Sequence, residues 1–418
     1  MWISDGMKRY IGLTKLPPAA LGSCWEHGPF PYETYRMQAI KLLDRWIFEE
    51  YAPPVRSDLA LYRIVYASIA LLAVPPIGWW LVDVPAAFFN PPLSLAAFFY
   101  SFPPFWVLTL LNVWLIVSLA ALLIGWHTRL ASLGTALTWF LLDSWAYATG
   151  KIDHDIFLVL APAILAFSAW GAHYSVDART LAKSKSHRVA LDAWPVSLFV
   201  LIIGLGMFTS GWAKLTTGWL DPTTSSTLGH LYRNYYVTGR TPWAAAQVLR
   251  VHAPLFWEGQ DWLATFLEVG FLLAIVRRTL FRLFCAMACV FHLAVWLVFD
   301  IGFFPNVLAY SVIVPYAQLP LVHLVARKVQ TASPLTRVPP FALLGLTAVP
   351  ILLTTLVFHD SLASVLHMPV SELVLSIGAI VGVTYLFKTT WGCITTSWLR
   401  VCRSAHAAHL SRGGGQER

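Results

Sequence analysis

The sequence predicts an all-α, polytopic integral membrane protein with about ten transmembrane helices. Of its 418 residues, 57% are hydrophobic and only 12% are charged, and soluble domains carry about twice that charged fraction. Twenty tryptophans among 14% aromatic residues are typical of a protein with many membrane–water interfaces. Apolar stretches of about 20 residues place the expected helices near 59–82, 104–124, 130–147, 155–170, 195–213, 260–276, 280–299, 303–324, 340–358 and 371–387.

The distribution of lysine and arginine predicts the orientation. Basic residues precede the first expected helix and gather in alternate loops, whereas loops 83–103 and 300–302 lack them. Because cytoplasmic loops carry the excess of positive charge, both termini are expected in the cytoplasm, and the membrane is expected to be a bacterial cytoplasmic membrane. The same positions account for the net charge of +8, so no nucleic acid partner is expected.

One expected outer segment, residues 214–259, is long, aromatic and moderately basic. Exposed aromatic side chains would be unfavourable in an open loop. The segment is therefore expected to fold as short interfacial helices that form a lid over the bundle. The alternative is a poorly ordered loop.

Besides Asp143 and Asp300, four ionisable residues lie in or at the outer ends of the expected helices, where such groups are costly and are candidates for function. Lys214 ends the fifth helix, and His154 opens the fourth. His292 lies in the outer half of the seventh helix, and Glu268 lies about two turns into the sixth. Their common depth predicts that separate helices bring them to one site.

Two of these residues, Lys214 and His154, also have a structural interpretation. The ammonium of Lys214 could extend to the interface beside Trp212 and Trp219. His154 could simply flank a helix start that Asp153 caps.

The other two residues have structural interpretations of their own. His292 could be a core histidine bonded to a neighbouring helix. Glu268 could form an ion pair with Arg233, Arg240 or Lys214.

Two further residue patterns are interpreted as structural. Arg63 lies about one turn into the first helix from the inner side, where it is expected to snorkel or to lock the bundle. Cys285, Cys289 and His292 share a helical stripe, but they extend over roughly 10 Å of one helix, too far for one zinc ion. No metal site is expected.

Five stretches together resemble a known family. They are "DLALYRIVYAS", "IGWHTRLAS", "DHDIFLVLAPAILAFSAWGAHYSVDA", "FTSGWAKLTTGW" and "VFHLAVWLVFDIGFFPNVLAY". In order and spacing they are similar to the HTTM domain, the transmembrane half of vitamin K-dependent gamma-glutamyl carboxylases and their bacterial relatives. The resemblance covers residues 56–325, between a cytoplasmic segment at 1–55 and two further helices at 326–390 that precede a basic tail at 391–418.

The resemblance implies chemistry for the site. Lys214 would be the catalytic base that deprotonates a reduced, vitamin K-like quinone, with His154 and His292 as catalytic partners. Trp212 and His292 would contact the quinone, and Glu268, Arg63 and Asp153 would support the site. O₂ and CO₂ would be co-reactants in a carboxylation.

Two departures from the family leave carboxylation open. The carboxylases have two adjacent lysines at the motif, where this chain has Ala213 and Lys214. Their large lumenal domain is not seen after residue 325. The expected partners are membrane lipid, a quinone and a secreted peptide or small-molecule substrate.

Three classes of protein therefore fit the sequence. The first is an enzyme that couples a reduced quinone to modification of a substrate. The second is a non-enzymatic factor for maturation of, or immunity to, an exported peptide. The third is a transporter or a lipid-binding bundle.

Overall fold

The computed structural model describes residues 31–55, 57–73, 76–92, 94–150, 155–181, 193–319, 339–357, 370–392 and 395. Asp153 and His154, together with the expected tail beyond residue 395, lie outside these ranges. The chain forms two compact units, residues 1–44 and 45–418. The helix α1 (Pro31–Arg45) belongs almost entirely to the first unit, and everything that follows concerns the second.

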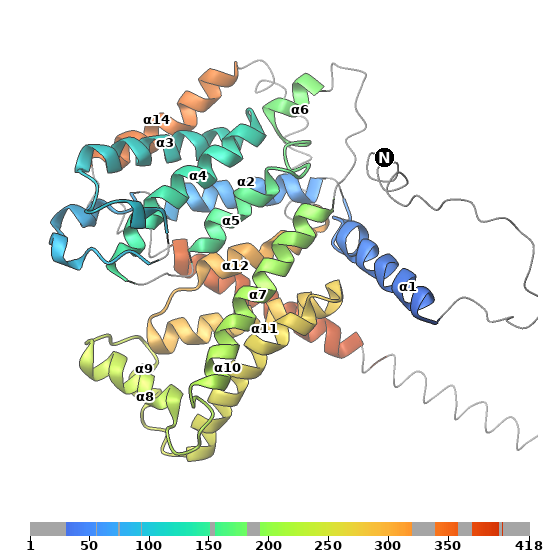
Figure 1. Ribbon diagram of the computed structural model, residues 1–418, viewed down its shortest axis with the longest axis vertical. Coiled ribbons are helices and arrows are strands. Elements are labelled where there is room, and N and C mark those ends of the chain that lie inside the picture. Colours follow the sequence, from blue (N-terminus) through green and yellow to red (C-terminus); the bar gives the residue numbers. More distant parts are fainter. Residues whose placement is uncertain are drawn as a thin grey trace, which may run out of the picture. The chain divides into compact units, whose positions relative to one another are not determined.

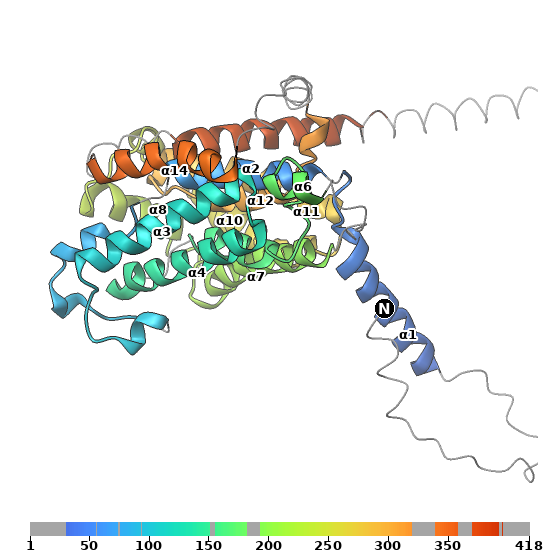
Figure 2. The same cartoon turned by 90° about the horizontal axis from the view of Figure 1, so that it is seen from above.

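The second unit is built from helices, and no strand occurs in the described ranges. The α-helices are α2 (Ser57–Ala73), α3 (Phe105–Ile124), α4 (Thr128–Ala146), α5 (Ile156–Leu165), α6 (Val176–Leu181), α7 (Trp194–Thr216), α8 (Ser226–Tyr232), α9 (Ala245–Val248), α10 (Pro254–Ala274), α11 (Arg278–Phe299), α12 (Phe304–Tyr310), α14 (Pro340–Val357) and a further helix, Val370–Gly392. In Figure 2, α14 and this last helix lie on one side of the bundle, and α4 and α7 lie on the other. The expected all-helical class is confirmed.

Four described helices are long and apolar enough to cross a membrane: α3, α7, α11 and Val370–Gly392. The chain is therefore an integral membrane protein by length and composition of its helices, but these four are fewer than the expected ten or so. The expected helix at 155–170 is only the ten-residue α5, which contains Pro162, and the described part of the one at 303–324, residues 303–319, forms α12 and two short 3₁₀ turns. Hydropathy depends only on how apolar the residues are, so it does not show where a helix ends within an apolar stretch.

Two other helices differ from the expected spans for reasons visible in their residues. The helix α2 ends at Ala73, shortly before Pro75 and Pro76, because proline lacks the amide N–H that a helix needs. The helix α10 has 21 residues but includes Glu258, Asp261 and Glu268, and these carboxylates lower its hydropathy.

The segment between α7 and α10 folds as short helices. It contains α8, the π-helix Arg233–Val237 and α9, which lie beside one end of α10 and α11 in Figure 1. A small apolar cluster of Leu231, Ala245 and Trp257 joins this segment to α10. Thr227 also binds the carboxylate of Asp261 on α10, through its amide at 2.9 Å and its hydroxyl at 2.6 Å.

Three of the family-like stretches meet where α3 turns into α4. Gly125 ends α3 in the left-handed region at φ +69°. A Cβ atom there would lie 1.8 Å from Nη1 of Arg63, whose Nη2 donates to the carbonyl of Tyr174 at 2.7 Å. Asp177 accepts hydrogen bonds from the amides of His127 and Thr128 at 2.9 and 2.7 Å. These contacts lock α2, the α3–α4 turn and α6 together.

A short segment before α2 binds the N-terminal end of α7 and the C-terminal end of α10. Trp46 Nε1 and the Tyr51 hydroxyl each donate to the carbonyl of Ile275, at 2.7 Å in both cases. Ser197, in the first turn of α7, donates its hydroxyl to the carbonyl of Ile47 at 2.9 Å. Arg278 completes the anchor through its amide, which donates to Glu50 at 2.8 Å.

Candidate functional site

An ion pair between α7 and α10 is the centre of the candidate site. Nζ of Lys214 lies 2.5 Å from Oε2 of Glu268, and the two side chains are only 18% and 11% exposed. The structural interpretation of Glu268 was an ion pair with Arg233, Arg240 or Lys214, and the structure pairs it with Lys214. The low exposure matters because an ion pair in water contributes little, whereas a desolvated pair holds its geometry.

Glycine allows α7 and α10 to approach closely enough for this contact. A Cβ atom on Gly211 would lie 2.8 Å from the backbone nitrogen of Val269 and 2.9 Å from Cβ of Glu268. Gly204, two turns earlier on the same face of α7, would clash with Ile275 at 2.5 Å. Glycines seven residues apart therefore form a flat stripe against which α10 packs. Lys214 follows Gly211 by three residues and so points at the same partner helix.

Trp219 covers the ammonium group on another side. Nζ of Lys214 lies 5.3 Å from the centre of the Trp219 ring, within the range of a cation–π interaction. The other contact of this indole is His230 of α8, whose ring stacks on it with centroids 5.0 Å apart. Lys214 is thus held by one carboxylate and one aromatic face.

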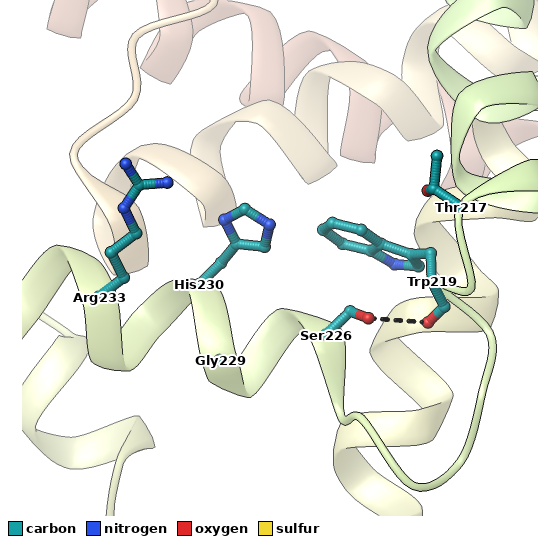
Figure 3. Close-up of a pocket in the computed structure, with 6 residues that line it drawn as sticks. All are labelled: Thr217, Trp219, Ser226, Gly229, His230 and Arg233. Atoms are coloured by element: carbon teal, nitrogen blue, oxygen red, sulfur yellow. Dashed lines mark hydrogen bonds between the residues drawn. The ribbon is translucent and has the colours of Figure 1, made fainter.

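An open surface pocket of about 430 Å³, called the cavity below, lies beside Trp219. Figure 3 shows its lining: Thr217, Trp219, Ser226, Gly229, His230 and Arg233. Burial lowers the pKa of His230 below its ordinary value, and the nearby charges of Arg233 and Lys214 lower it further. The imidazole is therefore mainly neutral near pH 7.

His292 lies in an aromatic core between α11 and α12. It is 2% exposed and stacks on Phe303 and on Tyr310, with ring centroids 4.6 and 5.9 Å away. Its Nε2 shares a hydrogen bond of 3.0 Å with the Tyr310 hydroxyl, and that hydroxyl also lies 3.3 Å from Sδ of Met207 on α7. The imidazole is thus enclosed by packed side chains.

The ion pair and the His292 cluster share two helices. Met207 and Lys214 are seven residues apart on α7, which is about 10 Å along the axis. On α10, Phe271 follows Glu268 by one turn and stacks on Tyr310 at 5.7 Å. Lys214 and His292 therefore lie in neighbouring layers of the bundle. They are connected through the packed side chains of Met207, Phe271 and Tyr310.

The remaining predicted site residues lie apart from this contact or outside the described ranges. Trp212 is 55% exposed on α7 and contacts Phe208 at 6.0 Å. Arg63, on α2, is fully buried against the α3–α4 turn described above. Asp153 and His154 lie outside the described residues, so their predicted roles stay predictions. Within the described ranges, no group of three or more histidine, cysteine or acidic side chains could hold a metal ion.

Sequence analysis did not single out His230, and it named Arg233 only as a possible partner of Glu268. Their signal is visible in hindsight: Ser226, Gly229, His230 and Arg233 follow the i, i+3, i+4, i+7 spacing of one helical face. The pattern spans a helix of only seven residues, which is too short to stand out by periodicity.

A sequence model of the HTTM domain matches residues 51–318. The match covers more than half of the chain, and so this protein belongs to the HTTM domain family, whose domain is the transmembrane part of vitamin K-dependent carboxylase-like proteins. Comparisons with curated proteins and with solved structures gave no significant match.

Proposed function

We propose that this protein is a membrane enzyme of the vitamin K-dependent carboxylase type, in which Lys214 acts as a base toward a reduced quinone. The observation that carries this proposal is the desolvated ion pair between Lys214 and Glu268. Family membership supports the class of protein, and the pair supports the position of the base. The substrate would be a peptide or small molecule at the outer face of the membrane.

A base must first lose its proton, and the pair offers a route. Moving the ammonium proton from Nζ of Lys214 to Glu268 leaves a neutral amine beside a neutral acid. In a poorly solvated site this transfer leaves no isolated charge, so its cost is much smaller than that of exposing either ion alone. Glu268 would then hold the proton while Lys214 accepts another from the bound ligand.

The side chains around the amine suit an aromatic, weakly acidic ligand. Trp219 already places a ring face against Nζ, whereas Trp212, two residues earlier on α7, projects from a different face of the helix. A reduced quinone, when bound, would supply the acidic hydroxyl and the electrons, with O₂ and CO₂ as co-reactants if the product is a carboxylate. Lys214 would hold the hydroxyl proton, and Trp219 would orient the ring.

His292 would support this site from the adjacent layer. Its contact with Tyr310 fixes Met207 and Phe271 on the two helices that carry the ion pair. We assign it a positioning role and assign proton transfer to Lys214 and Glu268. Because His292 is enclosed by Phe303 and Tyr310, direct contact with a quinone would require those rings to move.

The test uses the purified full chain in lipid nanodiscs with a reduced menaquinone analogue. Lys214→Ala is expected to lower the initial rate of quinol-dependent O₂ consumption by about 100-fold or more. Lys214→Arg should fail to the same extent, because arginine keeps its charge and does not act as a base near neutral pH. Lys388→Ala removes an exposed lysine from the last described helix and serves as the matched control.

Two results would contradict the proposal. If Lys214→Arg retained the wild-type rate, the lysine would be an interfacial anchor. If the wild-type protein neither oxidised nor bound the quinol, while a copurifying peptide stayed unmodified, the non-enzymatic peptide factor would be favoured.

A further inference from the structure

The cavity beside Trp219 forms around one face of α8. Ser226, Gly229, His230 and Arg233 lie on that face, as Figure 3 shows. Lys214 does not line the cavity, because the indole of Trp219 stands between them. The cavity is therefore separate from the proposed base, although the two share a wall.

The charges around the cavity are positive and largely uncompensated. Arg233 has no carboxylate within ion-pair distance in the part of the chain that the structure describes. On α10, Glu268 is paired with Lys214, and Asp261 accepts two hydrogen bonds from Thr227 at Oδ1 but keeps a negative charge that acts on His230. An anion in the cavity would thus meet a free guanidinium.

The lining also presents hydrogen-bond donors. Arg233 offers up to five N–H groups in a planar fork. His230 contributes a ring N–H, whereas Thr217 and Ser226 already donate their hydroxyl hydrogens to the carbonyls of Ala213 and Trp219. Arg233 and His230 therefore present donors from one helical face, which suits an oxyanion bound beside it.

The cavity lies at the depth of lipid headgroups. The helix α7 has 23 residues and is about 34 Å long, which exceeds the hydrocarbon thickness of about 30 Å. Residues that follow Thr216 are therefore at the interface. Tyr232, Tyr236 and Trp243 are 44%, 67% and 79% exposed in the same segment, as in an interfacial aromatic belt.

We propose that this cavity binds a phosphate group, with Arg233 as the principal contact and His230 as a second donor. A lipid headgroup and free phosphate share this chemistry. The cavity volume of about 430 Å³ falls in the range of small-molecule sites, about 300–1,000 Å³, which leaves room for a headgroup as well as its phosphate. The inference does not depend on the quinone chemistry proposed for Lys214.

The affinity should depend on pH through His230. The charged groups that act on it are Arg233 on its own helix segment, Lys214 on α7 and Asp261 on α10. The two cations favour the neutral imidazole and the carboxylate favours the charged one. A bound phosphate would favour the charged form, so binding should tighten as the pH falls.

The experiment is native mass spectrometry of the purified full chain with added phosphatidylglycerol or phosphatidylcholine. The phosphodiester charge of phosphatidylglycerol is constant between pH 5.5 and 7.5, so any change in binding reports on the protein. Arg233→Gln is expected to weaken phosphatidylglycerol binding about tenfold. Arg250→Gln, which removes an exposed arginine from the same segment, should leave it unchanged.

Further measurements separate the sources of phosphate and the role of His230. Lowering the pH to 5.5 should strengthen binding to the wild type and not to His230→Gln. Inorganic phosphate that displaces the lipid, or binds without it, supports the same site with a soluble ligand. Equal thermal unfolding midpoints for Arg233→Gln and wild type will show that the variant is folded. Arg233→Lys keeps the positive charge but loses the planar set of guanidinium N–H donors, so it should bind the lipid with intermediate affinity.

Three results would overturn the proposal. Arg233→Gln and Arg250→Gln could weaken lipid binding equally, which would indicate only general charge attraction. The second such result is that neither phosphatidylglycerol nor inorganic phosphate binds. Glutarate could occupy the site while both phosphate probes fail, which would make it a carboxylate site.

Discussion

Replacing Gly211 by alanine tests whether the close approach of α7 and α10 is needed for the ion pair. The added Cβ would lie 2.8 Å from the backbone nitrogen of Val269, whereas ordinary contact begins at 3.4 Å. Because a backbone atom cannot rotate away, the two helices would have to separate by about 0.6 Å at this level. Overpacking of this kind costs about 1–3 kcal/mol, which outweighs the gain of about 0.5–1 kcal/mol from replacing a helical glycine by alanine.

Gly259→Ala provides the matched control on the partner helix. Gly259 lies within α10, and a Cβ there would meet nothing within 4 Å. This variant should therefore gain the helix-propensity term alone and be slightly more stable than the wild type.

The assay is unfolding of the detergent-solubilised protein, followed by tryptophan fluorescence, with the three proteins measured side by side. Gly211→Ala should unfold at lower temperature than the wild type, and Gly259→Ala at the same or higher temperature. The quinol-dependent activity of Gly211→Ala should also fall, because the contact between Lys214 and Glu268 would lengthen. If Gly211→Ala were as stable and as active as Gly259→Ala, the close packing inferred at this glycine would be refuted.

Two further predictions follow from the same contacts. Glu268→Gln should lower the quinol-dependent rate about 10–100-fold at every pH, since an amide cannot take up the proton of its lysine partner. If Glu268 instead acted only through its charge, Glu268→Gln would keep the full maximal rate, and the rate would begin to rise at a lower pH. The pH–rate profile of the variant therefore distinguishes proton transfer from a purely electrostatic role. Gly125→Ala should destabilise the protein by about 2 kcal/mol or more, because its backbone is left-handed and its Cβ would meet Arg63. A wild-type unfolding temperature for Gly125→Ala would contradict this explanation.

The helical class and the central pair could be predicted from the residues themselves. Composition and apolar length indicate a helical membrane protein, and Lys214 and Glu268 stand out because each ends or interrupts an apolar run. That they meet depends on Gly204 and Gly211, which let two helices approach closely. Sequence shows these glycines but does not show which helix they face, so the pairing remained one of several alternatives.

Helix length was less predictable. The apolar stretches at 155–170 and 303–324 read as complete spans, yet the structure breaks them into α5 and α12 with irregular turns. Pro162 contributes to the first break. The second is a matter of packing, because every residue of α12 is buried, and a fully enclosed segment need not match the thickness of a bilayer.

The role of Arg63 shows a different limit. Its place in an apolar helix made it a candidate support for the site. The structure surrounds it with Gly125 and the carbonyl of Tyr174, in segments more than 60 residues away along the chain. Such contacts between distant stretches are set by the fold as a whole, and neither spacing nor composition reports them.

The segment from Trp46 to Tyr51 binds both helices that carry the ion pair. It binds the end of α10 through Ile275 and the start of α7 through Ser197. Ser197 is 17 residues from Lys214, which corresponds to about 25 Å of helix. Because this segment binds α7 and α10 at their other ends, it opposes lengthwise sliding of one helix against the other and so helps to keep the amine and the carboxylate in contact.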